Sequence, residues 1–404
     1  MKKSRLDEWI CRVEGIPELT RELLEDIQLR RLNRLLAALR ERAGFYRNLP
    51  EKLDTLKDLQ RLPFTTAEDI AVVPMQFLLV SQAEISRIIS GATSGTTGPA
   101  KRVFYTRRDT EHTVGFFAAG IGEMVSPGEK CMIAFPFTGP FGLGDLIAKA
   151  VEQLGGIPVK AGFGVSYREL CELVEREQPQ TYIGFPVCFL SLLRMYGEGF
   201  PVRRALLSAD ACPEGVMAAL KEEGIGLYPH YGSREMCLGG AITCSALEGM
   251  HLRENHVIAE IIDEAGDPLP DGQWGELVIT TIDMEAMPLI RYRTGDRARF
   301  LPEPCPCGSV ARRLDRVSRL ETGITMEVLD SLLFPCPELV DMKAAWHADR
   351  LTIEARTLGG KGREELENRL ATCFPGVIAE VSVLTAQPGD RPYYSGKRYI
   401  RNSK

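Results

Sequence analysis

A run of small and hydroxyl-bearing residues closed by a lysine has the composition of a phosphate-binding loop. It reads Gly91-Ala-Thr-Ser-Gly-Thr-Thr-Gly-Pro-Ala-Lys101. Glycines let the backbone curl so that successive N–H groups point inward, hydroxyl groups add neutral donors, and a lysine neutralises negative charge. The glycine spacing differs from that of a Walker A loop and of a Gly-x-Gly-x-x-Gly turn. We therefore predict a polyphosphate-binding loop, and the alternative is an ordinary surface turn.

Three further blocks place charged residues beside glycine. They are Tyr231-Gly-Ser-Arg-Glu235, Tyr292-Arg-Thr-Gly-Asp296 and Ser395-Gly-Lys397. Read alone, Glu235 could begin a helix, where the helix dipole favours an acid, and Asp296 could cap a turn. Lys397 alone resembles any exposed lysine near a chain terminus. The order of all four blocks along one chain is therefore more informative than any one of them.

The composition favours small-molecule partners over nucleic acid or membrane. The 404 residues carry a net charge of −6 and are 26% charged, so they offer no basic stripe for a nucleic-acid backbone. The first residues are charged and helix-like, unlike the apolar core of a secretory signal, and no window of about 20 residues is apolar enough to span a membrane. We predict a cytoplasmic protein without nucleic-acid or membrane partners.

The elements that must position the four blocks alternate between helices and strands. Residues 16–46 have apolar positions at helical spacing, and residues 84–90 and 102–106 are expected to be strands on either side of the glycine-rich loop. From residue 110 to 231 helical and strand segments alternate, which predicts a parallel sheet covered by helices on both faces. Ligands bind such sheets beyond the carboxyl ends of the strands.

After residue 240 the pattern changes to strands over 257–262, 275–281 and 297–300, joined by turns rich in Asp, Gly and Pro. The last residues are typical of a small domain with strands and one helix. The predicted fold class is α/β: a large N-terminal domain of parallel-type sheets flanked by helices plus a β subdomain, followed by a small α+β C-terminal domain. We place the large domain at residues 1–319 and the small, mobile domain that carries the tail lysine at 320–404.

In this order, the four blocks resemble the acyl-adenylate-forming (AMP-binding) superfamily of acyl-CoA synthetases, luciferases and adenylation domains. The sequence between them resembles the phenylacetate-CoA ligase family through four segments. These are Leu62-Pro-Phe-Thr-Thr, Asn255-His-Val-Ile-Ala-Glu-Ile-Ile262, Pro288-Leu-Ile-Arg-Tyr-Arg-Thr-Gly-Asp296 and Glu303-Pro-Cys-Pro-Cys-Gly308. The resemblance covers about residues 40–320, and the C-terminal domain matches through its tail.

The resemblance implies a two-step ligase reaction. A carboxylate attacks the α-phosphate of ATP to give an acyl-adenylate and pyrophosphate, and a thiol, with CoA as the expected acceptor, then displaces AMP. Such phosphoryl attack needs positioning and charge neutralisation more than a protein nucleophile. The implied catalytic residues are Lys397, a mobile cation that reaches the reacting phosphate, Glu235, which holds Mg2+, and Arg234. A homodimer is a further family-based expectation.

The resemblance also assigns residues to the nucleotide and to the acid. The nucleotide residues are Thr93, Ser94, Gly95, Thr96, Thr97, Gly98 and Lys101 at the pyrophosphate, Ser208, Ala209, Asp210 and Tyr231 at the adenine with Gly232 and Ser233 beside them, and Asp296 and Arg319 at the ribose. The acid pocket is expected to be lined by Phe135, Phe137, Thr138, Phe141, Gly142, Phe185 and Pro186. An aromatic lining suits an aryl or arylacetic acid, although any α/β core would contain such residues.

The cysteines suggest a separate metal site. Eleven cysteines, an odd number, are poorly explained by disulfides, and most are expected to be small buried hydrophobes. Cys305 and Cys307 are tightly spaced, and together with Cys244 and His251 they would make a closed tetrahedral zinc set. Cys-x-Cys spacing alone favours incidental thiols. The match of both halves to the ligase-like family shifts the prediction to structural Zn2+, with His256 as the competing imidazole.

Two departures from the family pattern leave alternatives open. Arg234 stands where the family has a threonine whose hydroxyl contacts the AMP phosphate, so it either binds phosphate itself or alters the site. Residues 318–322 replace a longer hinge, which bears on docking of the small domain and on the CoA step. The alternatives are an enzyme that loads a carrier-protein thiol or another acceptor, and a nucleotide-binding homologue without turnover. Retention of the charged residues of all four blocks argues against a nucleotide-binding homologue without turnover.

Overall fold

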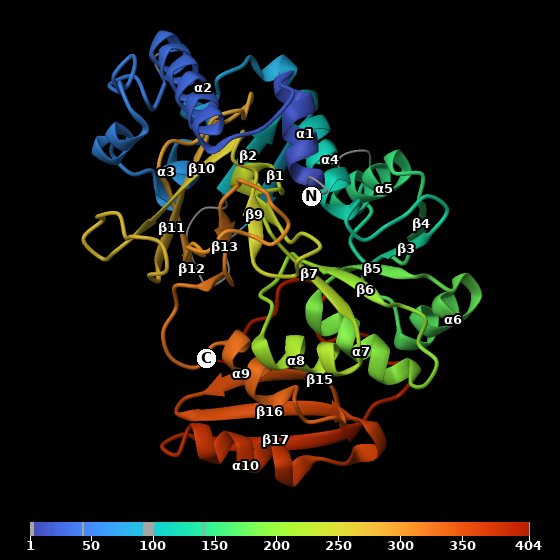
Figure 1. Cartoon of the computed structure of the whole chain (residues 1–404). Coiled ribbons are helices and arrows are strands. Elements are labelled where there is room, and N and C mark those ends of the chain that lie inside the picture. The colour runs from blue at the N-terminus through green and yellow to red at the C-terminus, as the bar shows by residue number, and fades with distance from the viewer. Residues whose placement is uncertain (1–3, 43, 92–100, 140–141, 404) are drawn as a thin grey trace. The chain divides into compact units, whose positions relative to one another are not determined.

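The chain forms two compact units in the computed structural model, which describes residues 4–42, 44–91, 101–139 and 142–403 (Figure 1). One unit comprises Met1–Glu123 and His230–Leu320, and the other comprises Met124–Pro229 and Glu321–Lys404. One boundary thus lies one residue beyond the predicted end of the large domain at residue 319. The division into a large and a small mobile domain stays a prediction.

The first unit begins with helices. They are α1 (Arg5–Glu14), α2 (Arg21–Arg42), the short α3 (Ala67–Val72) and α4 (Arg107–Ile121). The leucines of α2 are buried at helical spacing, as the pattern over 16–46 predicts. The helix-like character of the first residues indicates α1 without bounds; the helix is capped by the Ser4 hydroxyl and ends at Gly15 in the left-handed region. Thr66 caps α3 with a capping box, as its position before the helix predicts.

Antiparallel sheets complete the first unit. The predicted strands around the glycine-rich loop form a hairpin of β1 (Arg87–Gly91) and β2 (Lys101–Tyr105). A four-stranded sheet has the order β10 (Val257–Ile262), β11 (Gly275–Thr281), β12 (Tyr292–Ala298) and β14 (Ser318–Arg319). Three short strands, β8 (Ala241–Ile242), β9 (Met250–Leu252) and β13 (Arg313–Leu314), form an antiparallel ladder at one end of an eight-stranded sheet. Leucine, isoleucine and aromatic side chains from helices and sheets share one core.

The strand β12 differs from its prediction. It was expected over 297–300, but it begins at Tyr292 and therefore contains the whole Tyr-Arg-Thr-Gly-Asp block. Gly295 and Asp296 favour turns, yet β11 and β14 pair with β12 from its two sides, and this pairing outweighs the local preference. Asp296 is consequently a strand residue with a fixed direction.

The second unit contains the predicted parallel sheet. Its strands have the order β4 (Ile157–Lys160), β3 (Lys130–Ile133), β5 (Thr181–Gly184), β6 (Arg204–Leu207) and β7 (Gly226–Tyr231), and neighbouring strands pair in parallel. The alternating helices are α5 (Leu143–Gln153), α6 (Tyr167–Glu177), α7 (Pro186–Tyr196) and α8 (Glu214–Glu222). Burial of β5 along its whole length is typical of a strand covered on both faces. The last two residues of β7, His230 and Tyr231, belong to the first unit and pair there with β8.

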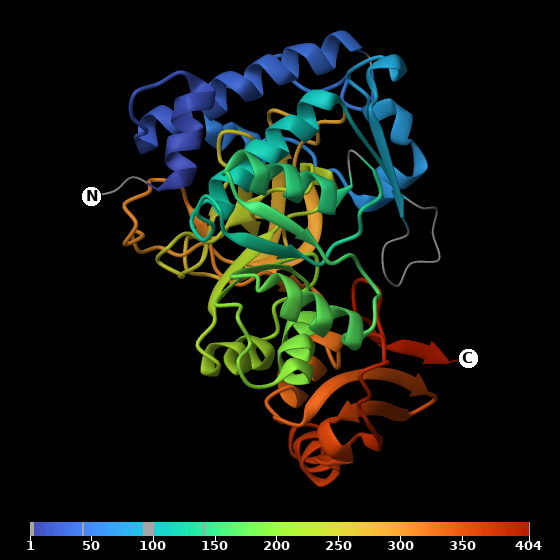
Figure 2. The ribbon, with the colours of Figure 1, turned by 90° about the vertical axis from the view of Figure 1, so that its right-hand side faces the viewer.

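The C-terminal segment has two helices and a mixed sheet. The helices are α9 (Met326–Leu333) and α10 (Arg363–Cys373), and the sheet order is β17 (Ile378–Thr385), β16 (Arg350–Thr357), β15 (Leu339–His347) and β18 (Arg401–Ser403). Figure 2 shows the terminal strand β18 at the edge of this sheet, where it pairs in parallel with β15. The segment shares one hydrophobic core with α7 and α8. These elements confirm the predicted α/β class with a small α+β C-terminal part.

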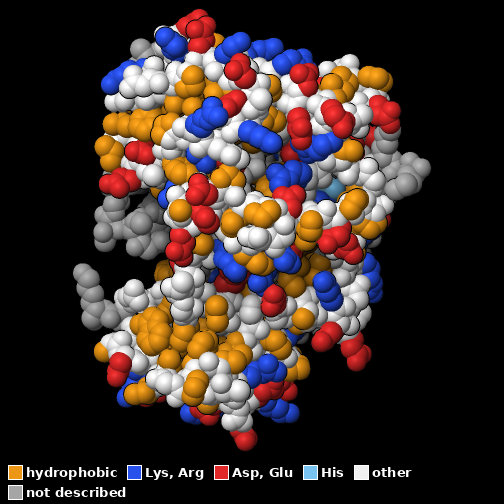
Figure 3. All heavy atoms as spheres, turned by 60° about the vertical axis from the view of Figure 1, so that its left-hand side comes forward, with side chains coloured by type: hydrophobic (Ala, Val, Ile, Leu, Met, Phe, Trp, Pro, Cys, Tyr) orange, Lys and Arg blue, Asp and Glu red, His pale blue; other side chains and the backbone are white. Residues whose placement is uncertain are grey.

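The surface is mixed in charge. Lysine, arginine and acidic side chains are interspersed on the face that Figure 3 shows. Among the helices that the structure describes, none combines the length and apolar character needed to cross a membrane.

Candidate active site and metal centre

A lysine, a glutamate and a tyrosine from three separate blocks meet in the first unit. The Lys101 ammonium, at the start of β2, donates to Glu235 Oε1 at 2.5 Å and to the Tyr292 hydroxyl at 2.9 Å. Glu235 lies in a short helical turn after β7, and its side chain is 7% exposed. Burial alone would raise the pKa of Glu235, but the charge and hydrogen bond of Lys101 hold that pKa below its ordinary value. Glu235 is therefore a buried, ionised carboxylate.

The backbone around Glu235 is held by its neighbours. The Tyr105 hydroxyl donates to the Arg234 carbonyl at 2.6 Å, which fixes the turn to the end of β2. Cys237, two residues after Glu235, has a φ of 51°, a conformation that costs a residue with a Cβ atom roughly 1–3 kcal/mol. Arg234 itself is exposed.

A second carboxylate lies nearby on β12. Asp296 accepts a hydrogen bond from the Tyr231 hydroxyl at 2.8 Å, and Arg319 forms an ion pair with its other oxygen at 3.0 Å. The register of β12 and β14 places Asp296 directly opposite Arg319, so the pair is a cross-strand pair. The structure thus brings together the charged residues that the sequence predicted from three of the four blocks.

Tyr292 is a site residue that the sequence reasoning missed. Its hydroxyl lies 2.9 Å from the Lys101 ammonium and 3.3 Å from Glu235 Oε1. Its place at the start of a recognised block is the signal that could have found it.

In the second unit, the Ser208-Ala-Asp210 segment follows β6. Ala209 has a φ of 67°, and strain of this kind clusters at ligand-binding sites. Asp210 accepts from the Ala211 N–H at 2.9 Å and from the Arg398 N–H at 3.0 Å. Burial raises the pKa of Asp210, and those hydrogen bonds and the charge of Lys397 partly oppose the rise. The tail lysine is therefore close to the loop after β6.

The predicted acid-pocket residues also lie in the second unit. Phe135 is fully buried and packs edge-to-face on Phe185, with ring centroids 5.3 Å apart. Pro186 begins α7, and Gly142 precedes α5. A Cβ atom at Gly142 would lie 2.8 Å from the Thr138 hydroxyl, so this turn needs glycine. Phe137 is half-buried with the Lys160 ammonium over its ring at 5.1 Å.

Several predicted residues lie outside the described parts of the chain. They are Thr93, Ser94, Gly95, Thr96, Thr97 and Gly98 of the loop and Phe141 of the pocket. The assignments of all these residues to nucleotide and acid stay predictions.

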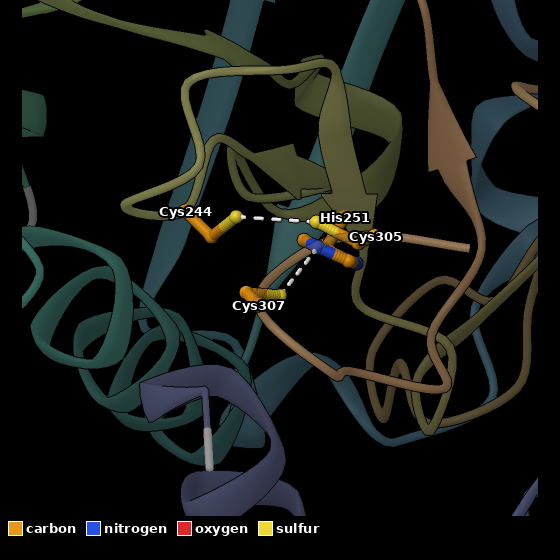
Figure 4. A group of neighbouring side chains, drawn as sticks. All are labelled: Cys244, His251, Cys305 and Cys307. Atoms are coloured by element: carbon orange, nitrogen blue, oxygen red, sulfur yellow. Dashed lines mark hydrogen bonds between the residues drawn. The ribbon is translucent and has the colours of Figure 1, made fainter. Parts of the chain in front are cut away.

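Three cysteines and one histidine point toward a common centre in the first unit (Figure 4). The potential ligand atoms of Cys244, His251, Cys305 and Cys307 all lie within 4.8 Å of one another. Cys244 follows β8, His251 lies on β9, and the two other cysteines precede β13, so the ladder of these strands brings the four together. Gly308 closes the turn with a φ of 79°, which favours glycine.

The geometry of this group fits a tetrahedral ion. Zinc–sulfur bonds of about 2.3 Å would place two sulfurs about 3.8 Å apart, and the Cys244 and Cys305 Sγ atoms are 3.6 Å apart. The His251 Nε2 atom lies 3.3 Å from the Cys307 Sγ atom, while its Nδ1–H donates to the Ala311 carbonyl at 2.8 Å. That bond fixes the tautomer that presents the Nε2 lone pair to a metal.

His256, the competing imidazole, belongs to a different group. Its Nδ1 atom and that of His112 lie 3.2 Å and 3.0 Å from Asp283 Oδ2. Arg31 and Arg108 form ion pairs with the other oxygen of Asp283, at 2.9 Å and 3.0 Å. Burial and the charge of a nearby arginine, Arg253, lower the pKa of His256. Because arginines already neutralise Asp283, this group is a poor site for a divalent cation.

Known proteins resemble this chain in sequence and in fold. The AMP-binding enzyme family matches residues 92–284. The chain is 32% identical over 320 residues to a phenylacetate-coenzyme A ligase of Thermus thermophilus, covering 73% of this chain and 70% of that one. It is 31% identical to one of Aromatoleum evansii, covering 92% of each chain. The crystal structure of 2-hydroxyisobutyryl-CoA ligase in the postadenylation state with R3-HIB-AMP has a TM-score of 0.78 at 20% identity, over 94% of this chain and 90% of that chain.

Fold, site and similarities define an enzyme of the AMP-forming acid–thiol ligase class. Such an enzyme adenylates a carboxylic acid with ATP and then transfers the acyl group to a thiol. The chain belongs to the phenylacetate-CoA ligase family, and its reaction is acid adenylation followed by thioester formation with CoA.

Proposed function

We propose that the acid is an aryl or arylacetic acid, and that its carboxylate is activated with Mg2+ and ATP at the residues described above. The observation that carries this proposal is the convergence of Lys101, Glu235 and Asp296, from separate blocks, around Tyr292 and Tyr231. Curated relatives named phenylacetate-coenzyme A ligase support an arylacetic substrate. The edge-to-face pair of Phe135 and Phe185 supports an aromatic lining.

The charged residues suit separate parts of the nucleotide. Asp296 would accept both ribose hydroxyls, with Arg319 as its partner, and the Ser208-Ala-Asp210 segment with Tyr231 would frame the adenine. The loop over residues 92–100 and Lys101 would hold the pyrophosphate side, and Lys397 would supply the mobile cation at the reacting phosphate. Arg234, an exposed cation next to Glu235, would bind phosphate directly in place of a hydroxyl.

Magnesium would be held by Glu235, because Mg2+ prefers a carboxylate together with phosphate oxygens. In the protein alone the Lys101 ammonium forms an ion pair with this carboxylate. Mg2+ would neutralise the phosphates. The protein would hold Glu235 in place through the Tyr292 hydroxyl, which contacts its carboxylate, and through the Tyr105 hydroxyl, which donates to the Arg234 carbonyl.

Glu235→Gln is expected to lower kcat/KM for pyrophosphate release by about 10²-fold, the scale of losing one preorganised charge. The amide keeps the size of the side chain but loses the charge that attracts Mg2+. Pyrophosphate release measured across a Mg2+ titration should show a raised Mg2+ requirement. Glu264→Gln, at an exposed acid of the same unit, is the matched control. A wild-type Mg2+ requirement in Glu235→Gln would remove this residue from the metal site.

A panel of carboxylic acids tests the substrate class. With ATP, Mg2+ and CoA, phenylacetate and other aryl acids are expected to give pyrophosphate, AMP and a thioester that mass spectrometry identifies. Aliphatic acids of similar size should react more slowly, since they lose contact with the aromatic lining. Preference for aliphatic acids would contradict the aryl assignment. ATP binding without acid-dependent pyrophosphate from any member would favour a nucleotide-binding homologue, and acyl-adenylate without thioester would favour a carrier-protein thiol or another acceptor.

We also propose that the Cys3His group binds structural Zn2+. Four protein ligands leave no open position for a substrate, which is typical of structural zinc. The distances between sulfurs and the tautomer of His251 support this assignment. A homodimer, a cytoplasmic location and a mobile segment 320–404 remain parts of the same proposal.

A further inference from the structure

Arg398, the residue after Lys397, is a buried arginine held by several acceptors. Its side chain is 7% exposed, and it donates two hydrogen bonds to the two carboxylate oxygens of Asp330, each at 2.9 Å. Further donors reach Asp341 Oδ1 at 2.9 Å and the Met342 carbonyl at 3.0 Å. Arg398 therefore ties the end of the chain to both α9 and β15.

The chain is also fixed on the other side of Lys397. The Tyr393 N–H donates to Asp341 Oδ2 at 2.7 Å, so one aspartate binds residues on both sides of the lysine. A little earlier, the carbonyls of Pro388 and Asp390 accept hydrogen bonds from the first backbone N–H groups of α6, at 2.6 Å and 2.9 Å. The short segment that carries Lys397 is thus a loop with two anchored ends.

The backbone of Arg398 contacts the Ser208-Ala-Asp210 loop, which follows β6. Its N–H donates to Asp210 Oδ2 at 3.0 Å, and Asp210 Oδ1 accepts from Ala211 at 2.9 Å. Each oxygen of this carboxylate thus has a backbone donor. The side chain of Arg398 thus binds α9 and β15, and its backbone N–H binds Asp210 in the loop after β6.

We propose that Arg398 is the positioning residue for Lys397, holding the lysine at the Ser208-Ala-Asp210 loop during adenylation. This inference rests on the proposed role of Lys397 as the cation at the reacting phosphate. The guanidinium makes no contact with substrate in this assignment and acts through the lysine. A catalytic group that is misplaced by about 1 Å can lose about 10²-fold in rate. Anchoring Arg398, the residue next to Lys397, is therefore expected to have a large effect on the rate of adenylation.

Arginine is needed because its planar fork matches a carboxylate with two parallel hydrogen bonds. A lysine at this position would keep the charge between Asp330 and Asp341, but it could not reproduce the planar arrangement of bonds to both Asp330 oxygens and to Asp341 Oδ1. Arg398→Lys is therefore a conservative variant that keeps buried charges neutralised and loosens the anchor.

Arg398→Lys is expected to lower kcat for acid-dependent ATP–pyrophosphate exchange by about 10- to 100-fold, with KM for ATP and for the acid unchanged. Transfer of a preformed acyl-adenylate to CoA should keep its wild-type rate, because that step does not need Lys397 at the phosphate. Arg401→Lys, at an exposed arginine of the same tail, is the control. Wild-type kcat for exchange, or equal losses in both half-reactions, would overturn the assignment.

Asp210→Asn tests the same connection from its other end if Arg398→Lys fails to fold. In the amide an NH2 group replaces one of the two oxygens, and this group cannot accept from the backbone N–H that faces it, so kcat for exchange at saturating ATP should fall. An unchanged kcat in a folded Asp210→Asn would count against the anchor. Loss of exchange in Lys397→Ala with unchanged kcat in both other variants would overturn this inference alone. Full exchange in Lys397→Ala would overturn the proposed role of the lysine as well.

Discussion

Lys397→Ala is expected to abolish acid-dependent pyrophosphate release while ATP binding is kept. A cation placed where negative charge develops stabilises the transition state, and loss of one such group costs about 10²–10³-fold. ATP binding is expected to persist because the pyrophosphate, adenine and ribose would be held by other residues. Pyrophosphate release and ATP binding, measured separately on the same preparation, check the two halves of this expectation.

The control for this variant is Lys361→Ala, which removes an exposed lysine from the same C-terminal segment. It should behave as the wild type in both measurements. A Lys397→Ala enzyme that releases pyrophosphate at the wild-type rate would show that the reaction does not use the tail lysine. Loss of ATP binding together with release would instead make Lys397 a binding residue.

Removal of the metal is expected to have the second large effect, on stability. In Cys305→Ser/Cys307→Ser, zinc content measured by plasma emission should fall from about one ion per chain to near zero, with a lower melting temperature. Structural zinc contributes directly to folding free energy, and about 10–16 kcal/mol of binding energy is typical for small zinc peptides. In this larger protein the hydrophobic core also stabilises the strands around the metal. Loss of the metal is therefore expected to unfold the β8, β9 and β13 ladder locally.

Two further variants define the ligand set. Cys373→Ser removes an exposed thiol and should leave zinc content unchanged. His256→Gln should also keep zinc, because this imidazole contacts Asp283 rather than the thiols. Zinc content near zero in chelator-washed wild-type protein would contradict the metal assignment, and loss of zinc in His256→Gln would contradict the choice of His251.

Much of the fold could be predicted because its signals are local. The alternation of helices and strands over residues 110–231 follows the period of apolar residues, and the hairpin around the glycine-rich loop follows β-rich segments that flank it. The full length of β12 could not be predicted in the same way. Gly295 and Asp296 favour a turn, and they become part of a strand because β11 and β14 pair with β12 on its two sides.

The site was predictable to the extent that its residues lie in contiguous blocks. Lys101, Glu235 and Asp296 were found in this way. The hydrogen-bonded group around Arg398 could not be predicted from the sequence. Its acceptors Asp330 and Asp341 lie 68 and 57 residues away, in segments without a recognisable motif. Tyr292 was visible within its block, but its role follows from its hydrogen bonds alone.

The cysteine group has a consequence for how the β subdomain holds together. Cys244 and Cys305 are separated by 61 positions along the chain, and a shared metal would close this stretch into a loop. By the chain-entropy account of cross-links, closing a loop of about 60 residues removes about 4 kcal/mol of freedom from the unfolded chain. Tyr292 and Asp296 both lie inside that loop. A metal at the cysteine group would thus help to keep β12, the strand proposed to bind the ribose, in its folded place, and oxidation of the thiols would release that strand from its cross-link.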